Sequence, residues 1–154
     1  AFMAMAKHPG FSDSANSMVK PPLEWFISAS RALNILPSKF AANFAKRETL
    51  LVQLDNLAQK PFYPPNVGGW PAGEIWLTAS SAQYRIEMAQ LLVKYGDIST
   101  INKSALSQRV ATVADLLGVG EWSDRTKIAL DDAKNDPTRL VVAALCAPEN
   151  LVSV

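Results

Sequence analysis

Residues 61–76 read PFYPPNVGGWPAGEIW and separate helix-forming sequence on either side. The stretch contains four prolines, which fix φ and remove backbone donors, and three glycines, which permit positive φ, so it does not continue a helix. Its aromatic side chains carry on the order of 150–250 Å² of surface each, unlike those of a flexible linker. We therefore predict an ordered loop that packs as a plug among helices, with the candidate binding residues Phe62, Tyr63, Asn66, Trp70, Glu74 and Trp76.

The whole chain has the composition of one globular domain. Its 154 residues are 49% hydrophobic, which is enough for one buried core, and we predict a single helical domain over residues 1–154. Fifteen basic and fourteen acidic residues leave a formal charge of +1, and no basic run is longer than Lys46-Arg47. We therefore expect no nucleic-acid partner and no anionic membrane surface as a partner. The longest apolar run covers residues 140–147, whereas a membrane span needs about 20 residues.

Metal and redox chemistry have few candidate residues. The only histidine, His8, lies beside a proline in a predicted loop and is interpreted as a solvated side chain. The only cysteine, Cys146, excludes an internal disulfide, and its apolar neighbours favour a small buried side chain over a reactive thiol. We expect no metal site and no cofactor.

Helical periodicity dominates the rest of the sequence. Ser, Thr, Asp or Pro precedes several of the periodic segments, and Gly or Pro follows them. No segment alternates with a period of two over the length of a strand. The predicted fold is all-α, an irregular bundle of about six helices over residues 21–36, 47–59, 79–95, 104–117, 123–135 and 137–147. Gly96 is predicted to be a left-handed C-cap, and residues 97–103 a connector.

Arg85 occupies an unusual position in this pattern. In the predicted helix over residues 79–95 the polar side chains form one stripe, and Arg85 lies about 180° from it, in the apolar half. A guanidinium buried there needs acceptors, because burying it alone costs several kcal/mol. The candidates are Glu74, Glu24, Asp55 and the carbonyls of residues 61–76, and we favour loop carbonyls together with one carboxylate.

Several motifs along the chain resemble one bacterial family. They are residues 19–24 (VKPPLE), 30–33 (SRAL), 57–62 (LAQKPF), 64–73 (PPNVGGWPAG) and Trp76. In order and spacing they are similar to the C-terminal part of the family catalogued as domain of unknown function 1800 (DUF1800). Arg85 matches an arginine of that family, and Ala147-Pro148-Glu149 is similar to its terminal Ser-Pro-Glu. Ala58 stands where the family usually has glycine, which affects local turn geometry.

The resemblance implies that the chain is the C-terminal portion of a longer protein, and it assigns no activity. Many members of the family look exported. The chain opens without Met or a secretory signal, and we predict that residues 1–7 are the tail of a helix that begins upstream.

Two binding functions are compatible with the central loop. The first is a structural or interaction role, in which the loop plugs the bundle and presents a surface to the missing N-terminal part of the protein or to a partner protein. The second is glycan or polymer binding by exposed rings of Tyr63, Trp70 and Trp76, with Asn66 and Glu74 as hydrogen-bonding neighbours.

A third function is hydrolysis at a site that the missing N-terminal region completes. Glu24 and Glu74 would be its acid and base, near Arg31 or Arg85. Glu24 and Arg31 share one stripe of the predicted helix over residues 21–36, either as a solvated face or as groups that reach a cleft beside the loop. With Arg85, they are candidate structural anchors. The sequence contains no nucleophile elbow, metal-ligand cluster or phosphate loop, so no catalytic residue is assigned.

Overall fold

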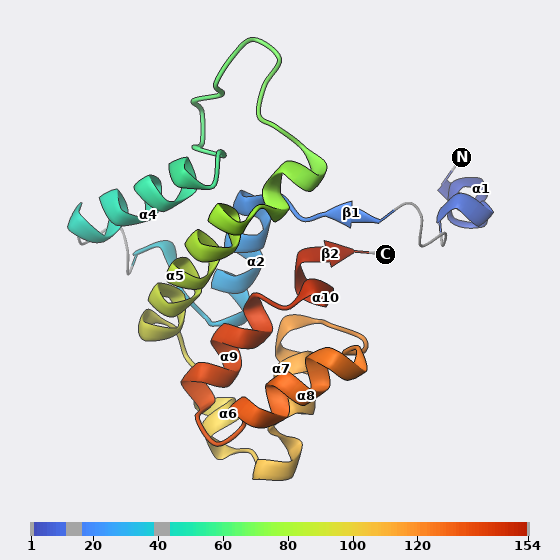
Figure 1. Cartoon of the computed structure of the whole chain (residues 1–154), viewed down its shortest axis with the longest axis vertical. Coiled ribbons are helices and arrows are strands. Elements are labelled where there is room, and N and C mark those ends of the chain that lie inside the picture. The colour runs from blue at the N-terminus through green and yellow to red at the C-terminus, as the bar shows by residue number, and fades with distance from the viewer. Residues whose placement is uncertain (1, 12–16, 39–43, 154) are drawn as a thin grey trace.

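The computed structural model of the chain describes residues 2–11, 17–38 and 44–153. These residues are mostly helical, and the expected all-α class is confirmed (Figure 1). The α-helices are α1 (Phe2–Ala6), α2 (Pro22–Ala32), α4 (Phe44–Asn56), α5 (Ala79–Tyr95), α6 (Ser99–Lys103), α7 (Arg109–Leu117), α8 (Asp124–Ala133), α9 (Pro137–Leu145) and α10 (Pro148–Leu151). Short 3-10 helices cover η1 (Pro9–Phe11), η3 (Gly73–Leu77) and η4 (Leu106–Gln108), and two-residue strands form β1 (Met18–Val19) and β2 (Val152–Ser153).

Helix α9 lies at the centre of the bundle. It packs against α5, α7, α8 and α10, while α4 packs on α5 (Figure 1). The side chains of Leu140, Val141, Ala144 and Leu145 are all buried, because they recur on one face of α9. Helix α5 packs along α9 and also contacts α4.

Local capping signals set several helix boundaries. The Thr78 side chain accepts a hydrogen bond from the Ser81 N–H at the start of α5. The Asp136 carboxylate accepts from the N–H groups of Thr138 and Arg139 at the start of α9. These bonds occupy backbone donors that a helix cannot satisfy internally, so such starts are predictable from sequence.

Two predicted boundaries were wrong. The expected connector over residues 97–103 contains helix α6, whose Ile101 is buried, and Asp97 accepts a hydrogen bond from the Ser99 N–H at its start. Ser104 was expected to start a helix at its own position, but its hydroxyl donates to the carbonyl of Ile101 and ends α6. Helix α7 begins only at Arg109.

Gly96 ends α5 for a different reason from the predicted one. Its φ is −89°, which is not left-handed. A Cβ at this position would lie 2.6 Å from the Leu33 Cβ and 2.9 Å from the Leu92 carbonyl oxygen. Gly96 is therefore required by the close approach of the segment after α2 to the end of α5, a contact between residues far apart in sequence.

Ala58 adopts the conformation that glycine favours. Its φ is +58°, in the left-handed region where a Cβ is strained. This residue follows α4 and reverses the chain toward the central loop, which explains physically why glycine suits this position.

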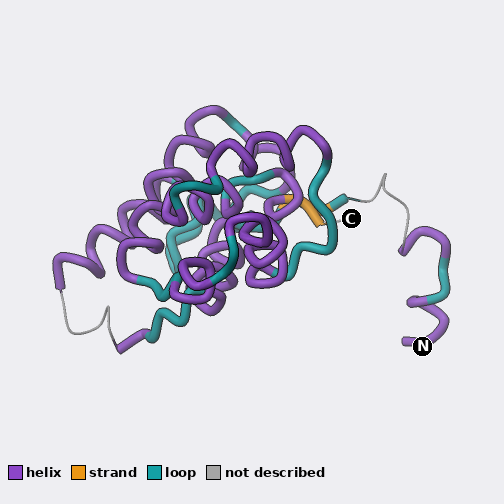
Figure 2. The backbone as a smooth tube through the Cα atoms, turned by 90° about the horizontal axis from the view of Figure 1, so that it is seen from below, coloured by secondary structure: helices purple, strands orange, loops and turns teal. Residues whose placement is uncertain are grey.

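Both ends of the helical body meet in a short strand pair. β1 pairs antiparallel with β2, with Val19 opposite Val152, and the Lys20 N–H donates to the Leu151 carbonyl at 2.7 Å. β1 also contacts η3, at the base of the central loop. Helix α1, which has no buried residue, lies apart from the helical body in both views (Figure 2).

Candidate functional site

The central loop is ordered by hydrogen bonds within itself. We refer to residues 60–73 as the aromatic loop. At its tip the Asn66 side-chain oxygen accepts from the Gly68 N–H at 2.8 Å, and the Gly69 N–H donates to the Asn66 carbonyl at 3.1 Å. Gly69 has a φ of +92°, which this tight turn requires. Nearer the base, the Trp70 indole N–H donates to the Lys60 carbonyl at 3.1 Å and links the two arms of the loop.

The aromatic loop projects from the bundle, so the predicted plug was wrong. It extends between the end of α4 and the start of α5, away from the other helices (Figure 1). The exposed fractions are 92% for Phe62, 71% for Tyr63 and 38% for Trp70, and Val67 is fully exposed. The turn bonds the N–H groups of Gly68 and Gly69 within the loop, and exposed backbone groups can bond to water, so the loop does not need to be buried to be ordered.

Trp76 is the one aromatic residue of the predicted set that is buried. It is 5% exposed and lies in η3, which contacts β1 and the beginning of α5. Glu74, two residues earlier, is exposed. The structure therefore divides the predicted binding residues into an exposed group on the aromatic loop and a buried tryptophan that fixes the base of the loop.

Arg85 is buried as predicted, but its partners were predicted wrongly. It is 1% exposed, and its Nη2 donates to the Lys20 carbonyl at 3.2 Å. Its guanidinium carbon Cζ lies 5.2 Å from the centre of the Trp25 ring. Neither a carbonyl of residues 61–76 nor a carboxylate of Glu24, Asp55 or Glu74 hydrogen-bonds to it among the described residues. Burial lowers the pKa of Arg85 to about 10.

Trp25 and Cys146 complete the surroundings of Arg85. The Trp25 indole N–H donates to the Leu145 carbonyl at 2.9 Å, which ties α2 to the end of α9. Cys146 follows Leu145 and is half-buried. Burial raises the pKa of its thiol to about 11, even though the positive charge of Arg85 acts in the opposite direction. The thiol is therefore protonated at neutral pH and unreactive, in line with its sequence context.

Glu24 and Arg31 lie on the exposed face of α2. Their exposure favours the solvated polar face over the cleft-facing alternative, and their role as structural anchors stays a prediction. Glu74 is exposed on η3, and no hydrogen bond or ion pair joins it to Glu24 or Arg31 among the described residues. The proposed acid and base pair therefore has no supporting geometry.

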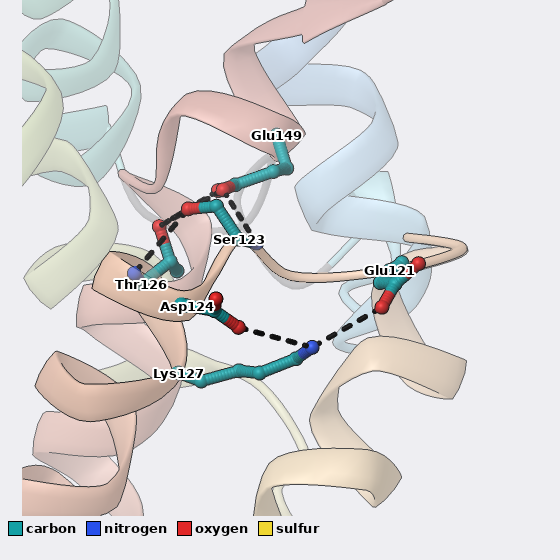
Figure 3. Close-up of polar contacts among 6 residues, drawn as sticks. All are labelled: Glu121, Ser123, Asp124, Thr126, Lys127 and Glu149. Carbon is teal, nitrogen blue, oxygen red and sulfur yellow. Dashed lines mark hydrogen bonds and ion pairs between the residues drawn. The ribbon is translucent and has the colours of Figure 1, made fainter.

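A polar cluster around Glu149 was missed by the sequence analysis (Figure 3). One Glu149 carboxylate oxygen accepts from the Ser123 N–H at 3.0 Å and from the Thr126 hydroxyl at 2.9 Å, and the other accepts from Thr126 at 3.0 Å. The Ser123 side chain caps α8 by accepting from the Thr126 N–H. Glu149 thus holds α10 against the N-terminus of α8, where the helix dipole favours a negative charge. The only sequence signal was Pro148-Glu149 in the resemblance, which carried no role.

The environment of Glu149 lowers the pKa of its carboxyl. Desolvation acts to raise this pKa, but hydrogen bonds from Ser123 and Thr126 outweigh it. On the opposite side of the α8 start, Lys127 pairs with Glu121 at 3.2 Å and with Asp124 at 3.9 Å, in solvent (Figure 3). With its acceptor oxygens engaged and no histidine in the cluster, the arrangement is suited to holding two helices together and not to proton transfer.

Other kinds of site find little support in the described part of the chain. Across residues 2–11, 17–38 and 44–153, no group of three or more His, Cys, Asp or Glu side chains could hold a metal ion. Within the same ranges, no helix is both long and apolar enough to cross a membrane. The aromatic loop is thus the feature whose exposure most needs an explanation.

Comparison with known proteins supports the family resemblance. Residues 1–152 match the family model described as "Protein of unknown function (DUF1800)". No curated protein and no solved structure is significantly similar to the chain.

Proposed function

The chain belongs to the DUF1800 family of proteins of unknown function, and we propose that its helical domain is an interaction module that uses the aromatic loop to dock on a protein surface. The observation that carries this proposal is the exposure of Phe62 and Val67 on an internally ordered loop. The partner surface lies either in another part of the same polypeptide or in a second protein.

The chemistry of the loop suits an apolar partner surface. Residues 61–73 contain no charged side chain. The consecutive residues Phe62 and Tyr63 are both exposed. Aromatic anchors of this kind contribute most of the binding energy in many protein interfaces when they enter a pocket. The complementary surface should therefore be an uncharged concavity that accepts Phe62 and the tip of the loop around Val67.

Order in the unbound loop supports the same proposal. The turn at Asn66 and the bond from Trp70 to the Lys60 carbonyl hold the exposed side chains in place before binding. A preorganised loop loses less conformational entropy on association than a flexible one. The hydrogen bonds of the loop thus restrict the arrangement of the exposed apolar side chains before a partner binds.

Glycan binding is a second candidate, because Tyr63 and Asn66 are both exposed on the same loop. Several observations make it weaker than protein docking. Trp76 is buried, the Trp70 indole N–H and the Asn66 side-chain oxygen are engaged within the loop, and the Lys60 ammonium lies 5.2 Å from the centre of the Tyr63 ring. The loop therefore offers few free polar groups around an open ring, which sugar recognition requires.

The test is site-specific photo-crosslinking in the intact gene product in its own cells. A photoreactive residue at Val67 should give cross-links to one peptide or a few neighbouring peptides that form an apolar surface. Adding Phe62→Ser should suppress them, because it removes the exposed anchor. The matched control is a photoreactive residue at Ile128, which is 66% exposed on α8.

Two results would refute protein docking. One is an equal yield and spread of cross-links from positions 67 and 128. The other is a yield from position 67 that Phe62→Ser does not change. A saturable change in tryptophan emission with soluble glycans, abolished by Tyr63→Ala, would favour the glycan alternative instead.

A further inference from the structure

The guanidinium of Arg85 is buried with two of its nitrogen atoms unpaired. Nε and Nη1 have no hydrogen-bond partner among the described residues, and the side chain is 1% exposed. Only Nη2 donates, to the Lys20 carbonyl. An unpaired donor in the interior is unfavourable, and more so when it carries charge, so an arrangement of this kind needs an acceptor.

No negative charge in the described part of the chain compensates Arg85. The groups that face it are the Trp25 ring of α2, the Lys20 carbonyl and the Cys146 thiol after α9. That thiol is protonated at neutral pH, whereas the guanidinium, with a pKa of about 10, is charged. A buried cation without a counter-charge is unusual, because proteins almost always pair such groups.

The backbone segment that bonds to the guanidinium follows a short strand pair. Lys20, whose carbonyl accepts from Arg85, comes directly after β1, and among the described residues β1 pairs with the two-residue strand β2. A pair of strands this short has little stability of its own. Local opening of β1 therefore gives a small solute access to Arg85 without unfolding the bundle.

We propose that Arg85 is the centre of a binding site for a small anion of the carboxylate class, enclosed beneath β1. The anion accepts hydrogen bonds from Nε and Nη1 and supplies the missing negative charge, and the Trp25 ring covers one face of the guanidinium. This site is separate from the aromatic loop and does not depend on the function proposed for it.

Formate is the smallest carboxylate and is the probe for the test. Thermal unfolding is followed at pH 7.5 while sodium formate replaces sodium fluoride at constant ionic strength, because the strongly hydrated fluoride ion is a poor ligand for a buried site. At a formate concentration tenfold above its Kd, Tm should rise by about 3–6 °C. Tryptophan emission should change with the same saturable dependence, because Trp25 lies against the site.

Arg85→Met is the direct variant, since it keeps side-chain length without the charge, and the formate response should disappear. Arg85→Lys provides a second variant that keeps the charge but loses the Nε and Nη1 donors, and its response should be at least tenfold weaker in apparent Kd. Arg109→Met is the matched control, because Arg109 also has a buried, unpaired Nε and donates to a backbone carbonyl, that of Lys134. It should respond to formate as the unaltered protein does.

The outcomes separate a specific site from general effects of salt. An equal rise in Tm in the unaltered protein and in Arg85→Met would overturn the proposal. A response in the unaltered protein that grows linearly and never saturates would also overturn it. The absence of any effect of formate would likewise overturn it. If Arg85→Met does not fold, the test rests on two other results: whether the formate response of the unaltered protein saturates, and whether that of Arg85→Lys is weaker.

Discussion

Replacing Glu149 by Gln tests whether this residue holds α10 to α8. The variant keeps the shape of the side chain and removes its negative charge. In the native protein the carboxylate accepts hydrogen bonds from Ser123 and Thr126 at the N-terminus of α8 (Figure 3). Glutamine can replace only some of these hydrogen bonds, because one of its two terminal atoms is an NH₂ group that donates and does not accept.

The size of the effect follows from the bonds lost. A hydrogen bond to a charged acceptor contributes roughly 1.5–3 kcal/mol, compared with about 1 kcal/mol for a neutral pair. The charge at the helix terminus adds about 0.3–1 kcal/mol. Because Glu149 is only half-buried, solvent screens part of this gain, and we expect Glu149→Gln to lose about 1 kcal/mol at pH 7. Tm should then fall by about 2–4 °C.

The effect of Glu149→Gln should depend on pH in a defined direction. The folded-state pKa of the Glu149 carboxyl lies below its usual value, so the unfolded state binds its proton first as pH falls. The stabilisation is fully present above the unfolded pKa of about 4.3 and is lost as pH falls through the lower folded pKa. The difference in free energy of unfolding between the two proteins should therefore be constant from about pH 8 to 6 and shrink toward zero below pH 4.

Urea unfolding at a series of pH values measures this difference directly. Glu121→Gln is the matched control, because Glu121 pairs with Lys127 beside the same helix start but is largely exposed. It should change the free energy of unfolding by less than about 0.5 kcal/mol. The reasoning is refuted if Glu149→Gln and Glu121→Gln have the same effect at pH 7, or if the Glu149→Gln difference persists unchanged at pH 3.

Three further predictions concern backbone conformation and the buried thiol. Gly96→Ala should lower the free energy of unfolding by about 1–3 kcal/mol, because the added Cβ would lie 2.6 Å from that of Leu33. Gly120→Ala adds a Cβ that meets open space, so the free energy of unfolding measured in urea should stay nearly unchanged. Ala58→Gly should raise the free energy of unfolding by about 0.5–1 kcal/mol, since φ is +58°, and a lower value would contradict the strain argument. At pH 8, Cys146 should react with iodoacetamide about a hundredfold more slowly than an ordinary thiol, and a rate equal to that of glutathione would contradict its raised pKa.

The sequence predicted those features that depend on nearby residues. The helix starts at Thr78, Ser123 and Asp136 follow from side chains that cap donors two or three residues away. The burial of Arg85 follows from its angular position on α5, because helical phase alone places it opposite the polar stripe. The motif resemblance likewise identified the family without knowledge of the fold.

The candidate site was only partly predictable. The residues of the aromatic loop were recognised, but their aromatic content indicated burial, whereas Phe62 and Tyr63 are exposed. Composition reports how much apolar surface a segment carries and not which way the segment leaves the bundle. The turn at Asn66 bonds the N–H groups of Gly68 and Gly69 locally, which orders the tip of the loop without packing against the helices.

For this chain, sequence by itself determined the helical class, the helix starts after Thr78, Ser123 and Asp136, the uncharged aromatic character of the central loop and the need of Arg85 for an acceptor. These follow from propensity, periodicity and charge, which act over a few residues. Tertiary structure alone decided that Lys20 bonds to Arg85, that Glu149 bonds to Ser123 at the start of α8, and that Gly96 must lack a side chain next to Leu33. Each of those contacts joins segments 26 to 65 residues apart, and their pairing is selected by the packing of the whole core.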